Sequence, residues 1–223
     1  MRVGLISDIH SNLVALEAVL EDMPDVEEVI CVGDVVGYNP WPGACVDRVR
    51  EVCSVCVQGN HDRLVETPER YAHNSMAGAG LELAKEQLET DQRDWLDRLP
   101  ARTTFADDRY LLAHSHPDPA RTDEYVFPRG FSRMRPYLDE YDGLVLGHTH
   151  RQHSETVDGK LVVNPGSVGQ PRDRDSDAAY AVLDTETNTV DLRRVSYDID
   201  RVINRIEELD LPTETGTRLL DGT

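Results

Sequence analysis

Five short apolar runs of this chain each end in histidine, aspartate or asparagine, and this pattern restricts the fold more than any other feature. The five segments read LISDIH, VICVGD, VCVQGNHD, YLLAHSH and LVLGHTH. Their polar residues are Asp8, His10, Asp34, Asn60, His61, Asp62, His114, His116, His148 and His150. A short apolar run before a polar turn predicts a buried strand. In α/β folds, the carboxyl ends of neighbouring strands meet at one crevice, so we expect these side chains to converge.

The distribution of histidine indicates a metal site. Six of the eight histidines lie in these clusters, although a single D-x-H or G-D is more often a helix cap or a satisfied polar residue. In His148-Thr149-His150, alternate side chains share one face of a strand, so both imidazoles can point at one ion. Imidazole, carboxylate and amide ligands suit Mn²⁺, Fe²⁺ or Zn²⁺. The ligands are too numerous for one ion, and two ions that share a bridging carboxylate would account for the surplus.

The rest of the pattern predicts an α/β fold. Strands at residues 2–7, 26–32 and 54–57 alternate with a helix capped by Ser11 or Asn12 and with another helix at 42–51. This alternation favours a parallel sheet with short crossovers.

The second half of the chain changes in character. Two helices at 74–89 and 91–99 form a helical insertion at about 63–100, and strands dominate after residue 101. Asp158-Gly159 predicts the type I′ turn of a hairpin, and a final amphipathic helix surrounds residues 202–209. We expect one domain over residues 1–211, with two sheets and outer helices, and a flexible tail at 212–223.

Composition narrows the classes of partner and environment. The formal net charge is −19, and lysine occurs only at 85 and 160. This favours a halophilic protein, because the Debye length falls to about 3 Å at 1 M salt; an ordinary acidic protein is the alternative. Such a charge disfavours nucleic acid as a partner. The absence of an apolar run of about 20 residues and a strand beginning near Met1 lead us to expect a cytoplasmic protein without a membrane span or signal peptide.

The four cysteines do not suggest a metal site. Cys53 and Cys56 form a lone C-x-x-C in an apolar run, and no second pair follows at the spacing of a zinc ribbon. We interpret all four as core residues.

The ordered series D-x-H, G-D, G-N-H-D, H and G-H-x-H at residues 5–150 resembles the calcineurin-like metallophosphoesterase superfamily. The segment NPGSVGQPRD at 164–173 is similar to the small prokaryotic phosphodiesterase branch of that superfamily. The resemblance implies a four-layer αββα sandwich, in which two packed mixed β-sheets are flanked by helices.

The resemblance also implies a role for each clustered residue. One divalent ion would be held by Asp8, His10 and His150, the other by Asn60, His114 and His148, and Asp34 would bridge the two. Mn²⁺ is the ion we expect, with Fe²⁺, Zn²⁺ and Ni²⁺ as alternatives. His61 would not be a ligand but would stabilise the transition state or protonate the leaving oxygen. Asp62 would orient the loop or an imidazole.

Other residues keep two interpretations. His116 could replace His114 as a ligand if the preceding strand ends later. Arg172 could contact the substrate phosphate or be a solvated arginine, and Asn12 could touch the site or simply cap a helix. Remaining aromatic and histidine residues lack support from a motif. Tyr38 and Trp41, just after Asp34, could form a wall of the pocket, but we expect each to fill the core or lie on the surface. We interpret His73 and His153 as surface residues.

The chemistry suggested is hydrolysis of a small or nucleotide-like phosphodiester, because paired cations would offset the charge of the phosphate and activate a water molecule. A phosphomonoesterase or a nucleotide pyrophosphatase is the alternative enzyme, and a non-catalytic metal-bound interaction scaffold is the alternative from another class. The segment GDVVGYNP lacks the arginine and second aspartate that protein Ser/Thr phosphatases carry, which disfavours phosphoprotein substrates. A homo-oligomer is possible.

Overall fold

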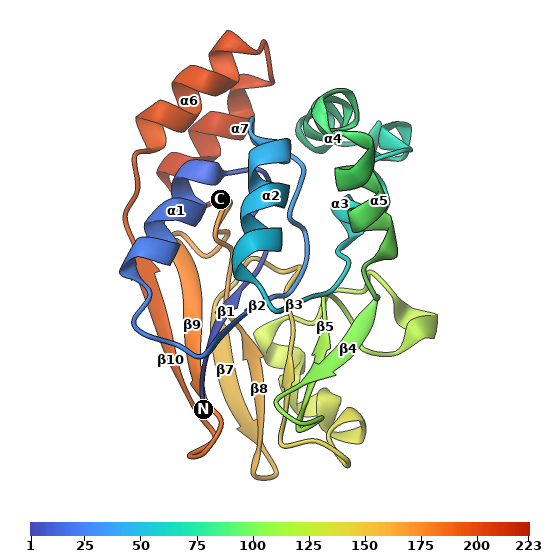
Figure 1. Ribbon diagram of the computed structural model, residues 1–223, viewed down its shortest axis with the longest axis vertical. Coiled ribbons are helices and arrows are strands. Elements are labelled where there is room, and N and C mark those ends of the chain that lie inside the picture. Colours follow the sequence, from blue (N-terminus) through green and yellow to red (C-terminus); the bar gives the residue numbers. More distant parts are fainter.

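Two packed five-stranded sheets form the centre of the computed structural model, which describes residues 1–223 (Figure 1). The first sheet has the order β10-β9-β1-β2-β3 and the second has the order β4-β5-β6-β8-β7. The first comprises β1 (Arg2–Ile6), β2 (Glu28–Cys31), β3 (Val55–Cys56), β9 (Ala178–Asp184) and β10 (Thr189–Val195). The second comprises β4 (Arg102–Phe105), β5 (Tyr110–Ala113), β6 (Gly143–Val145), β7 (His153–Val157) and β8 (Lys160–Asn164). Each sheet contains parallel and antiparallel pairs, so the predicted mixed α/β sandwich is confirmed.

Alternation along the strands separates the two faces of each sheet. Val3 and Leu5 of β1 lie between the sheets, whereas Ile6 belongs to the cluster under the helices. Leu112 of β5 and Val163 of β8 enter the same inter-sheet cluster from the opposite side. Burying one such side chain contributes about 1.5–3 kcal/mol, so this apolar layer fixes how the two sheets pack.

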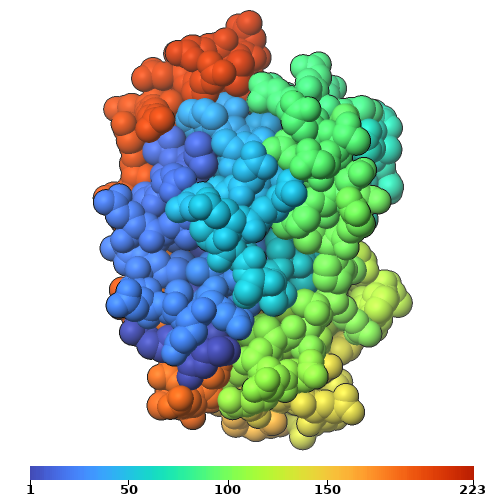
Figure 2. Space-filling view, in the orientation of Figure 1, coloured from blue at the N-terminus to red at the C-terminus, as the bar shows by residue number.

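Helices cover the outer face of the first sheet. They are α1 (Leu13–Asp22), α2 (Pro42–Val52), α4 (Ser75–Gln87) and α5 (Thr90–Arg98), and the short α3 (Asn60–Arg63) follows β3. In the space-filling view these helices form a continuous surface (Figure 2). The helix α1 begins after Asn12, whose side-chain oxygen accepts the Ala15 N–H at 3.1 Å, so the capping interpretation is confirmed.

The outer face of the second sheet carries a 3₁₀ helix, η3 (Pro128–Tyr137), in place of an α-helix. Phe131 and Met134 of η3 are buried against apolar residues of β5, β6 and β8. Pro136 lacks the N–H that an α-helical hydrogen bond would need, although Phe131, Met134 and Leu138 follow a helical spacing. Two further 3₁₀ turns are η1 (Pro68–Tyr71) and η2 (Pro119–Arg121).

Two local predictions from the sequence are confirmed. Asp158 and Gly159 join β7 to β8 with φ of 48° and 81°, as a type I′ turn requires. The four cysteines are unpaired; three lie inside the cluster under the helices and Cys53 packs against it.

The C-terminal segment corrects the prediction of a flexible tail. After α6 (Ile199–Glu208), the chain forms α7 (Thr213–Thr217) and the turn η4 (Arg218–Leu220) (Figure 1). Leu219 is 1% exposed and packs with Val202 and Ile206 of α6, and the Arg174 N–H donates to the Gly222 carbonyl at 2.9 Å. The sequence of this segment is polar and has little periodicity, and Leu219 is its one buried apolar side chain. The packing was therefore not predicted from the sequence.

No helix in the structure is both long enough and apolar enough to cross a membrane.

Candidate metal centre

The loops after β1, β2 and β6 turn sharply at the residues that carry the expected ligands. Five of these residues have left-handed backbone: Asp8 (φ 50°), His10 (48°), Asp34 (54°), His148 (66°) and His150 (54°). This conformation costs a non-glycine residue roughly 1–2 kcal/mol. Neighbouring loops hold it through backbone hydrogen bonds, from Asp8 to Gly33 at 3.0 Å and from His10 to Asp34 at 2.9 Å. Backbone strain that is over-determined by its surroundings is typical of functional sites.

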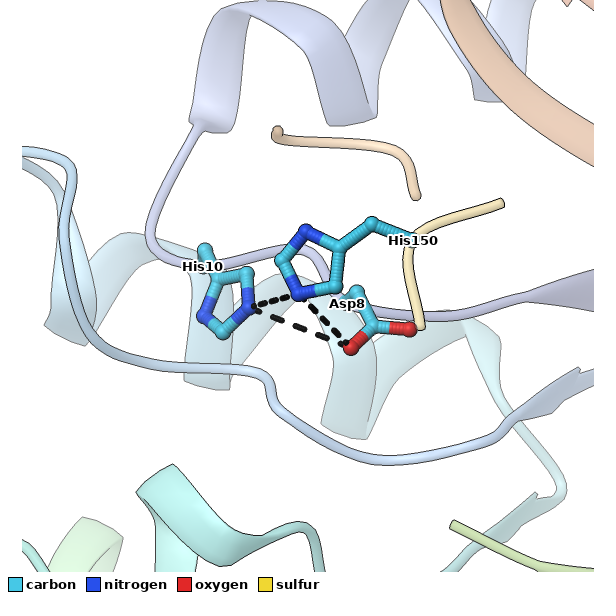
Figure 3. Close-up of side chains that lie close together, drawn as sticks. All are labelled: Asp8, His10 and His150. Carbon is cyan, nitrogen blue, oxygen red and sulfur yellow. Dashed lines mark hydrogen bonds and ion pairs between the residues drawn. The ribbon is translucent and has the colours of Figure 1, made fainter. Parts of the chain in front are cut away.

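Asp8, His10 and His150 meet in one buried group (Figure 3). The Nε2 atoms of the two imidazoles are 3.0 Å apart. Asp8 Oδ1 lies 3.3 Å from His150 Nε2 and 3.9 Å from His10 Nε2, and it has no hydrogen-bond donor.

The hydrogen bonds around this group fix both imidazole tautomers. His10 Nδ1 donates to the Val36 carbonyl at 3.1 Å and His150 Nδ1 donates to the Gln170 carbonyl at 2.6 Å. Burial lowers the pKa of both imidazoles well below 6.5, so both are neutral and their Nε2 atoms carry lone pairs. Two lone pairs and a carboxylate oxygen that face one another without a donor are unfavourable in a buried site. A cation bound among them would satisfy all three, so this group fits a metal ion.

A second group has the same character. His114 Nδ1 donates to the Val32 carbonyl at 2.8 Å, which leaves its Nε2 facing Asn60 Oδ1 at 3.1 Å. His148 Nε2 lies 3.0 Å from the Asp123 carbonyl, which leaves Nδ1 free. The ligand atoms of His114, His148 and Asp34 lie within 4.8 Å of one another. Imidazole, amide and carboxylate groups are types that bind a divalent ion, and His114 would give up its Nε2 proton on binding one.

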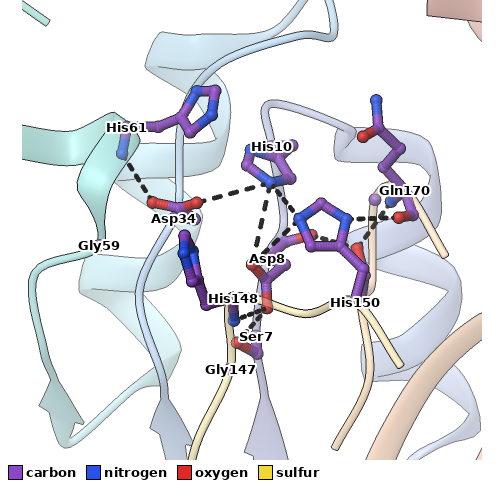
Figure 4. A network of polar contacts seen from close by, with 12 residues as sticks. Ser7, Asp8, His10, Asp34, Gly59, His61, Gly147, His148, His150 and Gln170 are labelled. Atoms are coloured by element: carbon purple, nitrogen blue, oxygen red, sulfur yellow. Dashed lines mark hydrogen bonds and ion pairs between the residues drawn. The ribbon is translucent and has the colours of Figure 1, made fainter. Parts of the chain in front are cut away.

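Asp34 lies between the two groups. Its Oδ2 is 3.6 Å from His10 Nε2 and 3.3 Å from His114 Nε2, and its Oδ1 accepts the His61 N–H at 2.8 Å. In Figure 4 the Asp34 carboxylate lies between the imidazoles of His10 and His61 and the imidazole of His148. Burial by itself would raise the pKa of Asp34, but His114 and His61 lower it well below its usual range. An ionised carboxylate in this position suits a bridging ligand.

The charges of the nearby groups depend on Asp34. Burial alone would lower the pKa of His114, but the Asp34 carboxylate raises it to about 10. Burial raises the pKa of Asp8 to about 6. Burial and the Asp34 carboxylate therefore determine the charges in this cluster.

His61 projects into the pocket between two tyrosine rings. Its ring centroid lies 4.8 Å from those of Tyr38 and Tyr71 and 4.7 Å from that of His10, and its Nδ1 has no partner. Burial lowers the pKa of His61 to about 4. A Cβ atom at Gly37 would lie 2.3 Å from His61 Nδ1, so this glycine leaves the space that the imidazole needs.

Geometry alone leaves His61 two possible roles. One of its ring nitrogens lies within 4.8 Å of ligand atoms of His10 and Asp34, so the distances permit a third ligand group. The resemblance instead predicts a role towards substrate.

Asp62 points away from the pocket and holds a loop. Its carboxylate accepts the backbone N–H groups of Asp34, Val35, Val36 and Gly59 at 2.8–3.2 Å. Burial raises the pKa of Asp62 to about 7, and the backbone donors oppose that shift. Asp62 therefore acts by positioning Asp34, which is one of the two orienting roles suggested for it.

A pocket of about 270 Å³ opens over both groups. It is lined by Asp34, Tyr38, Asn60, His61, Tyr71, His73, Asn74, Tyr125, His148, His150, Arg172 and Arg218. Arg172 reaches the pocket and donates to the Tyr38 hydroxyl at 3.2 Å. Tyr38 is buried and His73 is exposed, as expected, and both also line this pocket. Tyr71, Tyr125 and Arg218 also line it and were not predicted, because no local motif surrounds them.

Several candidates lie outside the centre. His116 belongs to none of the metal-capable groups and accepts the Asp118 N–H at 3.1 Å, so of these two histidines only His114 lies in such a group. Asn12 caps α1 and donates to the Gly169 carbonyl at 3.0 Å without lining the pocket. Trp41 packs beside the C-terminal cluster, and the half-buried His153 lies on β7.

Comparison with known proteins gives matches over most of the chain. The model of the calcineurin-like phosphoesterase superfamily domain matches residues 1–188. The protein MJ0912 of Methanocaldococcus jannaschii is 32% identical over 239 aligned positions, which cover 99% of this chain and 98% of that protein. Phosphodiesterase YfcE of Escherichia coli is 26% identical, covering 85% and 91%. The crystal structure of a metallophosphoesterase from Sphaerobacter thermophilus superposes with a TM-score of 0.85 at 32% identity, and the match covers all of both chains.

Proposed function

Because the chain belongs to the calcineurin-like phosphoesterase superfamily, we propose that it is a metal-dependent phosphodiesterase acting on a small or nucleotide-like ester. The observation that carries the proposal is the pair of acceptor groups that meet at Asp34. In a purely structural core, buried lone pairs would be paired with hydrogen-bond donors, whereas a dinuclear centre needs them free to bind ions. The left-handed backbone at several of these residues is also typical of a functional site.

In this proposal each group holds one divalent ion and Asp34 holds both. The first ligand set is Asp8, His10 and His150, and the second is Asn60, His114 and His148. Bound ions of this kind offset phosphate charge and lower the pKa of a coordinated water molecule. The mixture of imidazole, carboxylate and amide ligands favours Mn²⁺, with Fe²⁺, Zn²⁺ and Ni²⁺ as alternatives.

His61 is proposed to act on the substrate phosphate. His61 lines the pocket, and the flanking rings of Tyr38 and Tyr71 restrict the imidazole. Beside an anionic phosphate the pKa of an imidazole rises, so this ring can hold a proton for the leaving oxygen.

Two arginines are proposed to bind the non-bridging oxygens of the phosphate. Arg172 and Arg218 line the pocket, and neither pairs with a side-chain carboxylate; Arg172 donates to Gln170 Oε1, and Arg218 Nε donates to the Thr223 backbone oxygen. The Arg172 guanidinium lies over the Tyr38 ring at 5.6 Å, which fixes its direction. A guanidinium matches phosphate geometry because it offers two parallel N–H donors.

The test is hydrolysis of bis(p-nitrophenyl) phosphate against p-nitrophenyl phosphate, with added Mn²⁺. The net charge of −19 leads us to propose adaptation to salt, so the assay is run at low and at molar salt. We expect Mn²⁺-dependent turnover with preference for the diester, and none in the Asp34→Ala variant. Preference for the monoester would favour a phosphomonoesterase. No turnover of either ester with any of the four metals would favour the interaction scaffold.

A panel of natural esters then identifies the substrate class. Cyclic nucleotides, dinucleotides and glycerophosphodiesters differ in the groups on either side of the scissile phosphate. Arg172 and Arg218 are both proposed to contact the phosphate itself. We therefore expect Arg172→Ala and Arg218→Ala to lower the rate for every ester and to leave the order of preference among the esters largely unchanged.

A further inference from the structure

A second cavity, of about 230 Å³, adjoins the metal centre and is lined by cationic and aromatic side chains. Its main lining residues are His116, Arg121, Tyr125, Phe127, Arg129 and Arg133, all from the segment between β5 and β6. Tyr125 also lines the pocket over the metal centre, and its ring stacks on His148 with centroids 4.1 Å apart. The Tyr125 side chain is therefore a wall common to both spaces.

His116 is a buried donor without an acceptor. Its side chain is 5% exposed, and its Nδ1 accepts the Asp118 N–H at 3.1 Å, so a neutral ring carries its proton on Nε2. That Nε2 atom is buried and has no hydrogen-bond partner. The Tyr137 ring contacts the imidazole edge-on at 5.3 Å and fixes its orientation. An unmet buried donor costs about 1–3 kcal/mol, so an acceptor that reached Nε2 would be stabilising. His116 lines this cavity and also a second pocket beside Ser115 and Asp123.

Two arginines of the cavity also lack protein partners. Arg129 and Arg133 form no hydrogen bond or ion pair within the chain, although acidic residues outnumber basic ones by 42 to 23. Arg121, in contrast, is paired with Glu124 at 2.7 Å. Residues 121–135 contain four arginines and only two acidic residues, so this segment is locally cationic in an acidic protein.

We propose that this cavity binds a second phosphate group of the substrate while the scissile diester lies at the metal centre. The inference rests on the proposed phosphodiesterase function and narrows its substrate class to diesters that carry a further phosphate, such as a dinucleotide with a 5′-terminal phosphate. Unpaired guanidinium groups and an N–H donor are the groups that bind phosphate oxygens. The cavity is smaller than the roughly 300–1,000 Å³ of pockets for drug-sized ligands, so it suits one anionic group.

The kinetic test compares two diadenylates that differ only in a 5′-terminal phosphate. We expect the wild-type protein to hydrolyse the phosphorylated one with a kcat/KM about tenfold higher or more, as hydrogen bonds to charged groups provide. In the Arg129→Ala/Arg133→Ala variant this ratio falls towards one. Arg135→Ala is the matched control, because Arg135 is exposed, pairs with Asp158 and does not line the cavity, and it keeps the ratio. Equal efficiencies in the wild type, or a ratio kept by the double variant, overturn the proposal.

A binding test separates failure of this site from failure of the catalytic proposal. Isothermal titration of the metal-loaded protein with inorganic phosphate needs no turnover. We expect the double variant to bind one phosphate fewer than the wild type or the Arg135→Ala control. His116→Gln, which keeps an N–H donor near Nε2, should bind more tightly than His116→Phe. If the wild type and the double variant bind the same number of phosphates, the cavity is not a phosphate site. If the double variant binds one phosphate fewer but the wild type shows no preference for the phosphorylated diadenylate, the cavity binds phosphate but not the substrate's second phosphate.

Discussion

The metal centre and the apolar layer between the two sheets are both buried, but they are built in opposite ways. Between the sheets, Leu5, Leu112 and Val163 pack on extended strands and need no partner beyond one another. At the metal centre, Asp8 and His10 lie on left-handed backbone and present acceptors to other acceptors. The first region stabilises the fold under all conditions, whereas the second is unfavourable until a cation is bound. Substitutions in the two regions should therefore have contrasting effects.

The largest effect is expected at the shared carboxylate. Asp34→Ala removes the only side chain placed between both ligand groups, so we expect loss of at least one ion and a fall in kcat of roughly 10⁴-fold. Elemental analysis of the metal-loaded variant and diester hydrolysis measure the two effects. A variant that still binds two ions per chain would contradict the bridging role.

His61→Ala should separate turnover from metal binding. The variant is expected to keep both ions and to lose about 10²–10⁴-fold in kcat, the range attributed to general acid catalysis. Metal content and kcat are measured on the same preparation. Equal loss of metal would show that His61 is a ligand, a role that its distance to His10 and Asp34 permits.

Leu112→Ala tests the opposite region. Leu112 is fully buried between the sheets, so its truncation should lower the free energy of unfolding by about 2–5 kcal/mol. Urea denaturation at fixed Mn²⁺ concentration measures this change. The folded variant should keep its metal content and kcat, and a large fall in either would mean that the two regions are mechanically coupled.

The smallest expected effect is a gain in the stability of the metal-free protein on substitution of Asp8. It contrasts with the loss of stability expected for Leu112→Ala between the sheets. Asp8 Oδ2 accepts from the Ser7 hydroxyl and the His148 N–H, so in Asp8→Asn the amide nitrogen would replace the unpartnered Oδ1. That nitrogen can donate to His150 Nε2, and we expect the metal-free protein to gain about 1 kcal/mol. Thermal unfolding at pH 8 with a chelator should show the gain, and excess Mn²⁺ should reverse the order. A metal-free variant less stable than the wild type would contradict the inferred repulsion.

The sequence predicted those features whose signal is local. Asp8, His10, His148 and His150 each follow an apolar strand within a few residues, so strand pattern and ligand type could be read together. The sheets followed from the same alternation, because period-2 patterns decide which face each side chain takes.

The remaining features depend on contacts between distant segments. Tyr71, Tyr125 and Arg218 reach the pocket from an insertion, a long loop and the C-terminal segment, and no short motif marks them. The 3₁₀ helix η3 begins with Pro128 and contains Pro136, which obscured the helical spacing of its buried residues. Neither its packing nor the placement of Arg129 beside a cavity was predicted.

The left-handed backbone at five expected ligands restricts how the ion preference of this protein could be redesigned. Aspartate, asparagine and histidine are the non-glycine residues that tolerate this conformation best, and the five positions hold only aspartate and histidine. Exchanges among these three residue types would therefore keep the loop conformation while changing whether oxygen or nitrogen atoms are offered to the ion. Threonine or another β-branched residue would be strained at these positive φ angles, whatever its ligand chemistry. The ligands of this centre can therefore be varied only among a few residue types.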